Sequence, residues 1–420
     1  MEQEKELQRR KANNLKIYPL YRTFALDLFF YYAIIYLFLT IEKKITPAQV
    51  LQFEACYIFF KFISQIPCTL LIQKIGKRNS LVVANLILVI HILVIMFAAN
   101  FEMLLVSQLL CAIGYIIKST CESDMLYDSL EHNEKRGVIF SKQDGSAYSR
   151  YYYIDAITAI VSGFMFVVNP YLPLILCTMI LIAVFFFSTK FEEVQIKREK
   201  VKMRNEFKNL KISFRQILQS KRLRTLLIFN AVFIGTLKSL TTLRNNTLTF
   251  IGVPEQYFGV IFAIMGIISG IASKNQWRIH KKYRNTTLGF LSIPTVFSCM
   301  LLGFTLLCNF PYELTLTIIL ILFGAQYALT GPYYISIKQY LNNFTNSEKR
   351  VKISTAKNII ENLIASVILF AASAILDVFE VKYTLIIVGG ILAIAIVLLL
   401  DYMRGTVGLK MEEYGKKEII

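Results

Sequence analysis

Ionisable side chains lie deep inside several apolar stretches of this 420-residue sequence. The ionisable residues near the middle of such stretches are Asp27, Lys61, Lys118, Glu122, Asp155, Lys238 and Glu361. A charge at the centre of a bilayer costs about 3 kcal/mol on insertion scales, so it needs a partner or water. Carboxylates and ammonium groups in such places can bind a charged solute and exchange protons with it. They therefore indicate solute binding and proton transfer.

Asp27 is the candidate for proton coupling. A carboxylate removed from water holds a proton more readily, and an approaching cation displaces that proton. Protonation and solute binding can then compete for one group, which is the minimum requirement for coupling to a proton gradient. The alternative is a structural ion pair, because pairing is the least costly state of a charge in the membrane.

Lys118 and Glu122 are four residues apart and share one face of a helix. They either neutralise each other or act on a solute. Other polar and aromatic side chains at similar depth could line a cavity or pack between helices. These candidates are Tyr31, Tyr32, Tyr115, Gln326 and Tyr327.

The elements that must position these residues are long apolar segments. The sequence is 55% hydrophobic, with a mean hydropathy of +0.52. Apolar runs of roughly 20 residues recur along it, which is the length of a helix that crosses the hydrocarbon core. We predict twelve transmembrane helices, over residues 18–40, 47–74, 80–98, 102–129, 142–168, 171–190, 222–250, 255–279, 286–309, 313–340, 353–377 and 382–403. The fold class is thus an all-α polytopic membrane protein, with the lipid bilayer as a partner.

The net charge of +18 could suggest a nucleic-acid partner, but its distribution argues against one. About 35 Lys and Arg residues lie in the connections on the side of the two termini. About three, Lys43, Lys44 and Lys382, lie on the other side. The positive-inside rule then places both termini in the cytoplasm. We expect a monomer in the plasma membrane, bound to no nucleic acid.

The spans group into two halves. We predict a cytoplasmic N-terminal tail, a first six-helix bundle, a basic cytoplasmic linker that forms an amphipathic helix, a second bundle and a C-terminal tail. Their ranges are 1–17, 18–190, 191–221, 222–403 and 404–420. Similar basic loops at 76–80 and 281–286, and at 133–136 and 347–350, indicate an internal repeat.

The loop between the second and third spans carries a family resemblance. The segment 67–78, PCTLLIQKIGKR, resembles the Gly-x-x-x-Asp-[Arg/Lys]-x-Gly-[Arg/Lys]-[Arg/Lys] signature of the major facilitator superfamily. Gly76, Lys77 and Arg78 match it, whereas Thr69 replaces the first Gly and Gln73 replaces the Asp. The segment 124–130, DMLYDSL, resembles a form found in bacterial members.

This resemblance implies two pseudo-symmetric six-helix bundles around a central cavity that is lined by spans 1, 4, 7 and 10. It directs attention to the candidates on these spans, which are Asp27, Lys118, Glu122, Lys238, Gln326 and Tyr327. It also implies that the loop residues Gln73, Gly76, Lys77 and Arg78 act in gating. Because Gln73 is neutral, we expect contacts at this loop to depend on neutral hydrogen bonds.

The motifs of an ATP-driven pump or a soluble enzyme are missing from the sequence, which contains no Walker loop, HExxH or nucleophile elbow in a suitable context. Its seven cysteines form no metal-binding pattern. We therefore expect no cofactor and no metal.

The leading hypothesis is proton-coupled export of a small amphiphilic, cationic or zwitterionic compound. The alternative within the class is uptake of a nutrient such as a vitamin or peptide. Outside the class, a transporter-derived sensor or a membrane-embedded enzyme remains open.

Overall fold

The computed structural model describes residues 2–131, 136–194, 217–283, 286–343 and 350–406, together with 212, 214 and 215. The described chain contains helices and no strand. The helices are α1 (Glu2–Ala25), α2 (Ile35–Leu37), the π-helical turn η1 (Phe38–Glu42), α3 (Pro47–Ile75), α4 (Lys77–Phe97), α5 (Phe101–Ser129), α6 (Arg136–Val168), α7 (Leu172–Thr189), α9 (Lys221–Phe250), α10 (Gln256–Lys274), α11 (Gln276–Tyr283), α12 (Thr287–Leu307), α13 (Tyr312–Asn343), α14 (Arg350–Val378) and α15 (Val381–Thr406).

Eleven of the described helices are long and apolar enough to cross a membrane. Large apolar side chains such as Phe97 and Val168 remain 74% and 79% exposed, as expected for surfaces that face lipid rather than water. The predicted all-α multi-pass membrane fold is confirmed. The count differs from twelve because the first predicted span is not among the eleven.

The first span is interrupted in its middle. Helix α1 ends at Ala25, residues 26–34 form bends and turns, and regular structure resumes with α2 and η1. Phe30 has a φ of 62°, a conformation that costs a non-glycine residue free energy and persists only where the surroundings impose it. The continuous helix predicted over 18–40 is therefore wrong at the residues that surround Asp27.

Local sequence signals set the ends of the neighbouring helices. At the start of α3, the Thr46 hydroxyl accepts a hydrogen bond from the Gln49 backbone N–H (3.1 Å), and the Gln49 side chain accepts one from the Thr46 N–H (2.9 Å). This is a capping box, and Pro47 occupies the first helical position. At the other end of α3, Gly76 has a φ of 90°, which lets the chain turn into α4.

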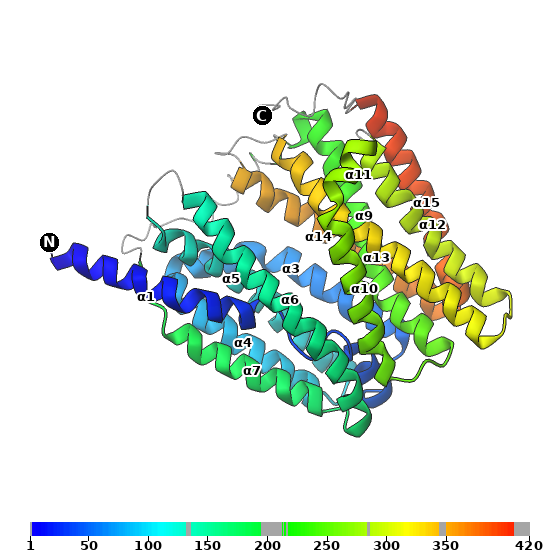
Figure 1. The fold of residues 1–420 in the computed structure, drawn as a ribbon, viewed down its shortest axis with the longest axis horizontal. Helices are drawn as coiled ribbons and strands as arrows, with labels where there is room; N and C mark the ends of the chain where they lie inside the picture. The colour runs from blue at the N-terminus through cyan, green and yellow to red at the C-terminus, as the bar shows by residue number, and fades with distance from the viewer. Residues whose placement is uncertain are drawn as a thin grey trace. The chain divides into compact units, whose positions relative to one another are not determined.

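Contacts between Cα atoms divide the chain into two compact units. Unit 1 comprises Met1–Ile45, Ile63–Met203 and Glu255–Val260. In it α4 packs on α5 and α7, and α1 packs on α5, α6 and α7 (Figure 1). A buried cluster that includes Tyr21 and Ile117 joins these helices.

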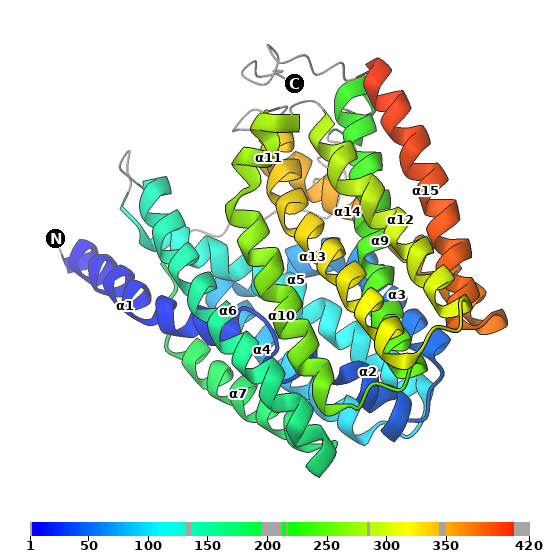
Figure 2. The same cartoon turned by 45° about the vertical axis from the view of Figure 1, so that its right-hand side comes forward.

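Unit 2 comprises Thr46–Phe62, Arg204–Pro254 and Ile261–Ile420. In it α12 packs on α13 and α15, and α9 packs on α14 and α15 (Figure 2). The first half of α3 belongs to this unit. Its Ala55 and Ile58 form a small core with Ala365 and Leu369 of α14, and the Ser373 hydroxyl donates a hydrogen bond to the Ala48 carbonyl (2.8 Å).

The predicted bundle boundaries 18–190 and 222–403 stay predictions. The predicted amphipathic helix within 191–221 lies outside the described residues over 195–211, and so does most of the predicted tail 404–420. The repeat segments 133–136 and 347–350 lie largely outside them as well.

Candidate functional site

Asp27 lies in the interruption of the first span, where hydrogen bonds hold its carboxylate. Its Oδ1 accepts hydrogen bonds from the Tyr115 hydroxyl, from the Tyr32 hydroxyl (2.7 Å) and from the Leu28 backbone N–H (2.9 Å). The two tyrosines are both predicted site residues, so the structure brings three of the candidates together. The third predicted tyrosine of this group, Tyr31, is 5% exposed and packs edge-on against Tyr32.

Lys118 is a buried ammonium group without a hydrogen-bond partner in the described part of the chain. Its side chain comes from α5, is 1% exposed, and its Nζ makes no hydrogen bond there. Nζ lies 5.1 Å from the centre of the Tyr115 ring, a cation–π contact that compensates for only part of the lost hydration. Asp27 and Glu122 both attract it electrostatically.

Glu122 has a different partner from the one considered above. Its carboxylate accepts hydrogen bonds from the Arg22 guanidinium and from the Tyr21 hydroxyl (2.9 Å). Arg22 also binds Asp144 (3.1 Å). The pair Arg22–Glu122 is 8% and 1% exposed, so each charge depends on the other. Glu122 therefore forms its hydrogen bonds with Arg22 and Tyr21 rather than with Lys118, which it attracts only electrostatically.

In unit 2, a second buried cation is organised by α9, α12 and α13. The Nε of Arg244 donates a hydrogen bond to Gln326 Oε1 (2.7 Å), and Gln326 Nε2 donates one to the Ser298 hydroxyl (2.9 Å). The guanidinium stacks 4.6 Å from the centre of the Tyr327 ring. Gln326 and Tyr327 are both predicted site residues.

Arg244 has no acidic partner within ion-pair distance among the residues that the structure describes, although it is only 4% exposed. An arginine side chain does not lose its proton in a protein. A full positive charge is therefore held under hydrogen-bonding and stacking groups that contribute no negative charge. Lys118 resembles Arg244 in one respect, because it too has no acidic partner within ion-pair distance among the described residues.

The predicted candidate Lys238 belongs to a separate cluster in unit 2. It interacts electrostatically with Glu54 and Glu361. Glu361 itself pairs with Lys357 (3.1 Å) and accepts a hydrogen bond from the Asn230 amide (2.9 Å). Charges of both signs are therefore gathered on α3, α9 and α14.

The predicted gating loop contacts the ends of two other helices of unit 1. Lys77 Nζ pairs with Asp128 (2.6 Å) and Asp124 (3.4 Å) at the end of α5. Arg78 donates hydrogen bonds to the Thr189 and Phe191 carbonyls (2.7 and 3.2 Å) at the end of α7.

The contacts at this loop are ionic, although Gln73 replaces the signature acid. Asp128 supplies the negative charge from another helix, and Gln73 Oε1 is buried without a hydrogen-bond partner in the described chain. The expectation of neutral hydrogen bonds in place of the signature acid stays a prediction, because these contacts are made by Lys77 and Arg78 and not by Gln73. The gating role of Gln73, Gly76, Lys77 and Arg78 stays a prediction.

Sequence reasoning missed several residues of these sites, among them Arg22, Glu54 and Ser298. Arg22 lies near the start of the predicted first span, and no spacing rule relates it to Glu122. Glu54 is an acidic residue inside the second apolar run, which is a signal that the sequence does contain. Ser298 carries no signal, because nothing in the sequence relates it to Gln326.

Comparison with known proteins gives one family match. Residues 20–337 match the model described as Major Facilitator Superfamily. No curated protein sequence matches this chain.

Two kinds of solved transporter structure resemble the chain at low sequence identity. The nucleoside transporter NupG aligns with a TM-score of 0.69 and 9% identity, over 96% of this chain and 100% of its own. A POT family transporter in complex with a thioalcohol-conjugated peptide gives 0.66 and 12%, over 96% of each chain. A POT family transporter in complex with 5-aminolevulinic acid gives 0.64 and 12% over the same shares. At these identities the likeness supports the fold alone.

The buried pair yields a stability prediction. Arg22→Leu leaves the Glu122 carboxylate buried without its cation, and we expect a loss of about 3–5 kcal/mol of unfolding free energy. Removing both charges in Arg22→Leu/Glu122→Leu should restore more than half of that loss. Unfolding of the purified protein in mixed micelles measures both. Arg9→Ala removes an exposed arginine of the same helix and should leave stability unchanged. Equal destabilisation by the single and double variants would contradict the pairing.

Proposed function

Because this chain belongs to the major facilitator superfamily, we propose that it is a proton-coupled secondary transporter of a small organic solute that carries an anionic group. A zwitterion fits best. The family is shown by the sequence match, and the solved neighbours are transporters. What we propose beyond the family is the class of solute and the proton as coupling ion.

The observation that carries the solute class is Arg244. Its guanidinium is buried, permanently charged and without a carboxylate partner among the described residues. Burial of an uncompensated charge costs several kcal/mol, and a carboxylate or phosphate of a solute would remove that cost through a charge-assisted hydrogen bond. Gln326 fixes the guanidinium by one edge, and the Tyr327 ring supports its face.

Lys118 supports the same conclusion from unit 1. A purely cationic solute would not need a cation in unit 1 that has no acidic partner within ion-pair distance among the described residues. Asp27 supplies a hydrogen-bonded carboxylate that could receive an ammonium group, so a zwitterion satisfies both signs of charge. The two POT family structures hold a conjugated peptide and 5-aminolevulinic acid, and both are amino acid-like compounds with an amine and a carboxylate.

Asp27 is the proposed proton site. Three donors reach one carboxylate oxygen, so the ionised form is well solvated by the protein itself. Protonation would weaken these bonds and free the interrupted segment 26–34 to adopt another conformation. A proton that enters down its gradient, worth about 2.3 kcal/mol per 100 mV, would then drive the change between the two states.

Several finer points of the proposal are decided by assay. We propose export across the plasma membrane by a monomer with cytoplasmic termini, and uptake of a nutrient is the alternative direction. Family membership favours transport over catalysis or sensing.

Proteoliposomes with an imposed pH gradient distinguish the solute classes. The solutes to be tested are radiolabelled 5-aminolevulinic acid, a dipeptide, uridine and tetraethylammonium. We expect the first two to accumulate, and transport of tetraethylammonium alone would contradict the proposal.

Substitution of the proton site separates coupling from binding. In Asp27→Asn we expect gradient-driven accumulation to be lost, whereas exchange of labelled for unlabelled solute across the liposome continues, because exchange needs no net proton transfer. Asp401→Asn, at an exposed position of α15, is the matched control and should behave as the parent protein. Full gradient-driven accumulation of the solute by Asp27→Asn would contradict the assignment of Asp27 as the proton site.

Substitution of the buried cation tests the solute class. Arg244→Gln keeps hydrogen-bonding capacity but removes the charge, and we expect KM for a carboxylate-bearing solute to rise by about tenfold or more, which is the usual effect of losing one buried charge-assisted bond. An ester of the same solute should be unaffected. Arg278→Gln alters an exposed arginine on α11 and serves as the control. Equal KM values in the parent and Arg244→Gln proteins would refute the role of Arg244.

A further inference from the structure

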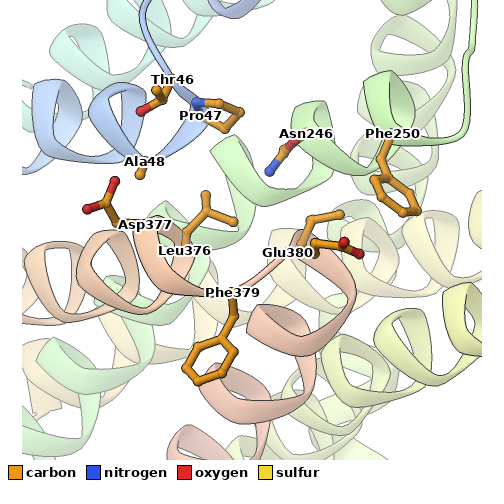
Figure 3. A pocket seen from close by; sticks show the side chains of 10 residues that line it. Thr46, Pro47, Ala48, Asn246, Phe250, Leu376, Asp377, Phe379 and Glu380 are labelled. Atoms are coloured by element: carbon orange, nitrogen blue, oxygen red, sulfur yellow. The ribbon is translucent and has the colours of Figure 1, made fainter.

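A cavity lies within unit 2, where the start of α3, the end of α9 and the turn between α14 and α15 meet. It has a volume of about 320 Å³, enough for a small organic molecule. Figure 3 shows its lining. None of its lining residues takes part in the site described above, so the proposed transport function leaves it unexplained.

Asn246 is the polar group at the base of this cavity. Its side chain belongs to a residue that is 8% exposed, and it makes no hydrogen bond to any residue that the structure describes. Figure 3 shows its amide projecting toward the space between Leu376 and Glu380, with the nitrogen foremost. A half-turn of the amide group brings Oδ1 to the same place. The amide can therefore exchange a hydrogen bond with a ligand that enters the cavity.

The rim of the cavity is acidic. Asp377 is exposed and forms no ion pair or hydrogen bond among the described residues. Glu380 pairs with Lys382 through Oε2 (2.7 Å), which leaves its Oε1 without an ionic partner in that part of the chain. Two carboxylates against one ammonium give the rim a net negative charge, so an anionic ligand is disfavoured.

The remaining walls are aromatic and apolar. Phe250 and Phe379 line the cavity and are 47% and 46% exposed, so their ring faces are available to a ligand. Phenyl rings attract an organic cation through their negative faces. In the described part of the chain, no group of three or more His, Cys, Asp or Glu side chains could hold a metal ion. The lining therefore suits an organic ammonium better than a metal cation.

We propose that this cavity binds a primary ammonium group, with Asn246 Oδ1 as hydrogen-bond acceptor, Asp377 and Glu380 as counter-charges, and Phe250 and Phe379 as the surrounding walls. The ammonium comes either from a free amine or from the headgroup of an aminophospholipid. A bound ammonium would also strengthen the junction of α3 with α14, which is already formed by the Ser373–Ala48 hydrogen bond.

The test is equilibrium dialysis of the purified, delipidated full chain against radiolabelled n-butylammonium. We expect saturable binding and a higher melting temperature in its presence, and neither effect with n-butanol. The variant Asp377→Asn/Glu380→Gln should weaken binding about fivefold to tenfold, as expected for two largely exposed charges. Asn246→Leu should weaken it as well.

Controls keep the result interpretable. Glu313→Gln removes an exposed carboxylate at the start of α13 and should leave binding unchanged. Melting without ligand checks that each variant is folded. The proposal is overturned if n-butylammonium does not saturate, if Glu313→Gln weakens binding as much as the double variant, or if Asn246→Leu binds like the parent protein.

Binding of n-butylammonium to the protein in nanodiscs of two lipid compositions identifies the source of the ammonium group. If phosphatidylethanolamine displaces n-butylammonium relative to discs of phosphatidylglycerol alone, the lipid headgroup is the natural occupant. If the two compositions bind n-butylammonium equally, a free amine is the occupant. Both results retain the ammonium site, and neither depends on the transport assays.

Discussion

A charge in the hydrocarbon layer needs a counter-charge, hydrogen-bond partners or water, and this requirement divides the deep residues of the chain into two kinds. Some are matched within the protein, as Arg22 is by Glu122 and Lys357 is by Glu361. Others lack an acidic partner in the described chain, as in the cases of Lys118 and Arg244. The matched pairs can be explained by a structural role, because the two charges of each pair already compensate each other. The unmatched cations have no such explanation, and a negatively charged group of a solute provides one.

The interruption of the first span follows from the same requirement. Non-helical backbone at membrane depth is tolerated only where protein or water satisfies its polar groups. Here the break surrounds Asp27, and the two tyrosine hydroxyls and the Leu28 N–H converge on its carboxylate. The left-handed φ of Phe30 is held by these surroundings. Broken helices mark ion and solute sites in other transporters, so a carboxylate at such a break is well placed for proton exchange.

Much of this organisation could be predicted from the sequence, and the exceptions have physical causes. Long apolar runs specify membrane helices by their length, so the fold class followed from this pattern, and the loop signature at 67–78 indicated the family. Helical spacing also placed Lys118 and Glu122 on one face. It could not show that Arg22, far from Glu122 in sequence, takes that carboxylate, because partner choice depends on packing between α1 and α5.

Two further features were beyond a pattern of residue types. The run over 18–40 is apolar enough for a continuous helix, and only tertiary contacts reveal that it breaks. The cavity beside Asn246 is formed by separate helix ends whose residues have no periodic relation. Features that depend on a single helix could be predicted from the sequence. Features that depend on contacts between several helices could not.

The central claim is that each of the unmatched cations, Lys118 in unit 1 and Arg244 in unit 2, becomes accessible to a solute that enters from water. Cysteine accessibility tests it most directly, starting from a transport-active variant in which all seven native cysteines are replaced, since each of them is a free thiol. With a single cysteine at Tyr327 or Tyr115, a membrane-impermeant thiol reagent should label both positions, and a transported carboxylate-bearing solute should protect them. A cysteine at Ile394, an apolar position in the middle of α15 that is 64% exposed, should resist the reagent because we expect it to face lipid. Absence of labelling at Tyr327 and Tyr115 from either side of the membrane would contradict the account.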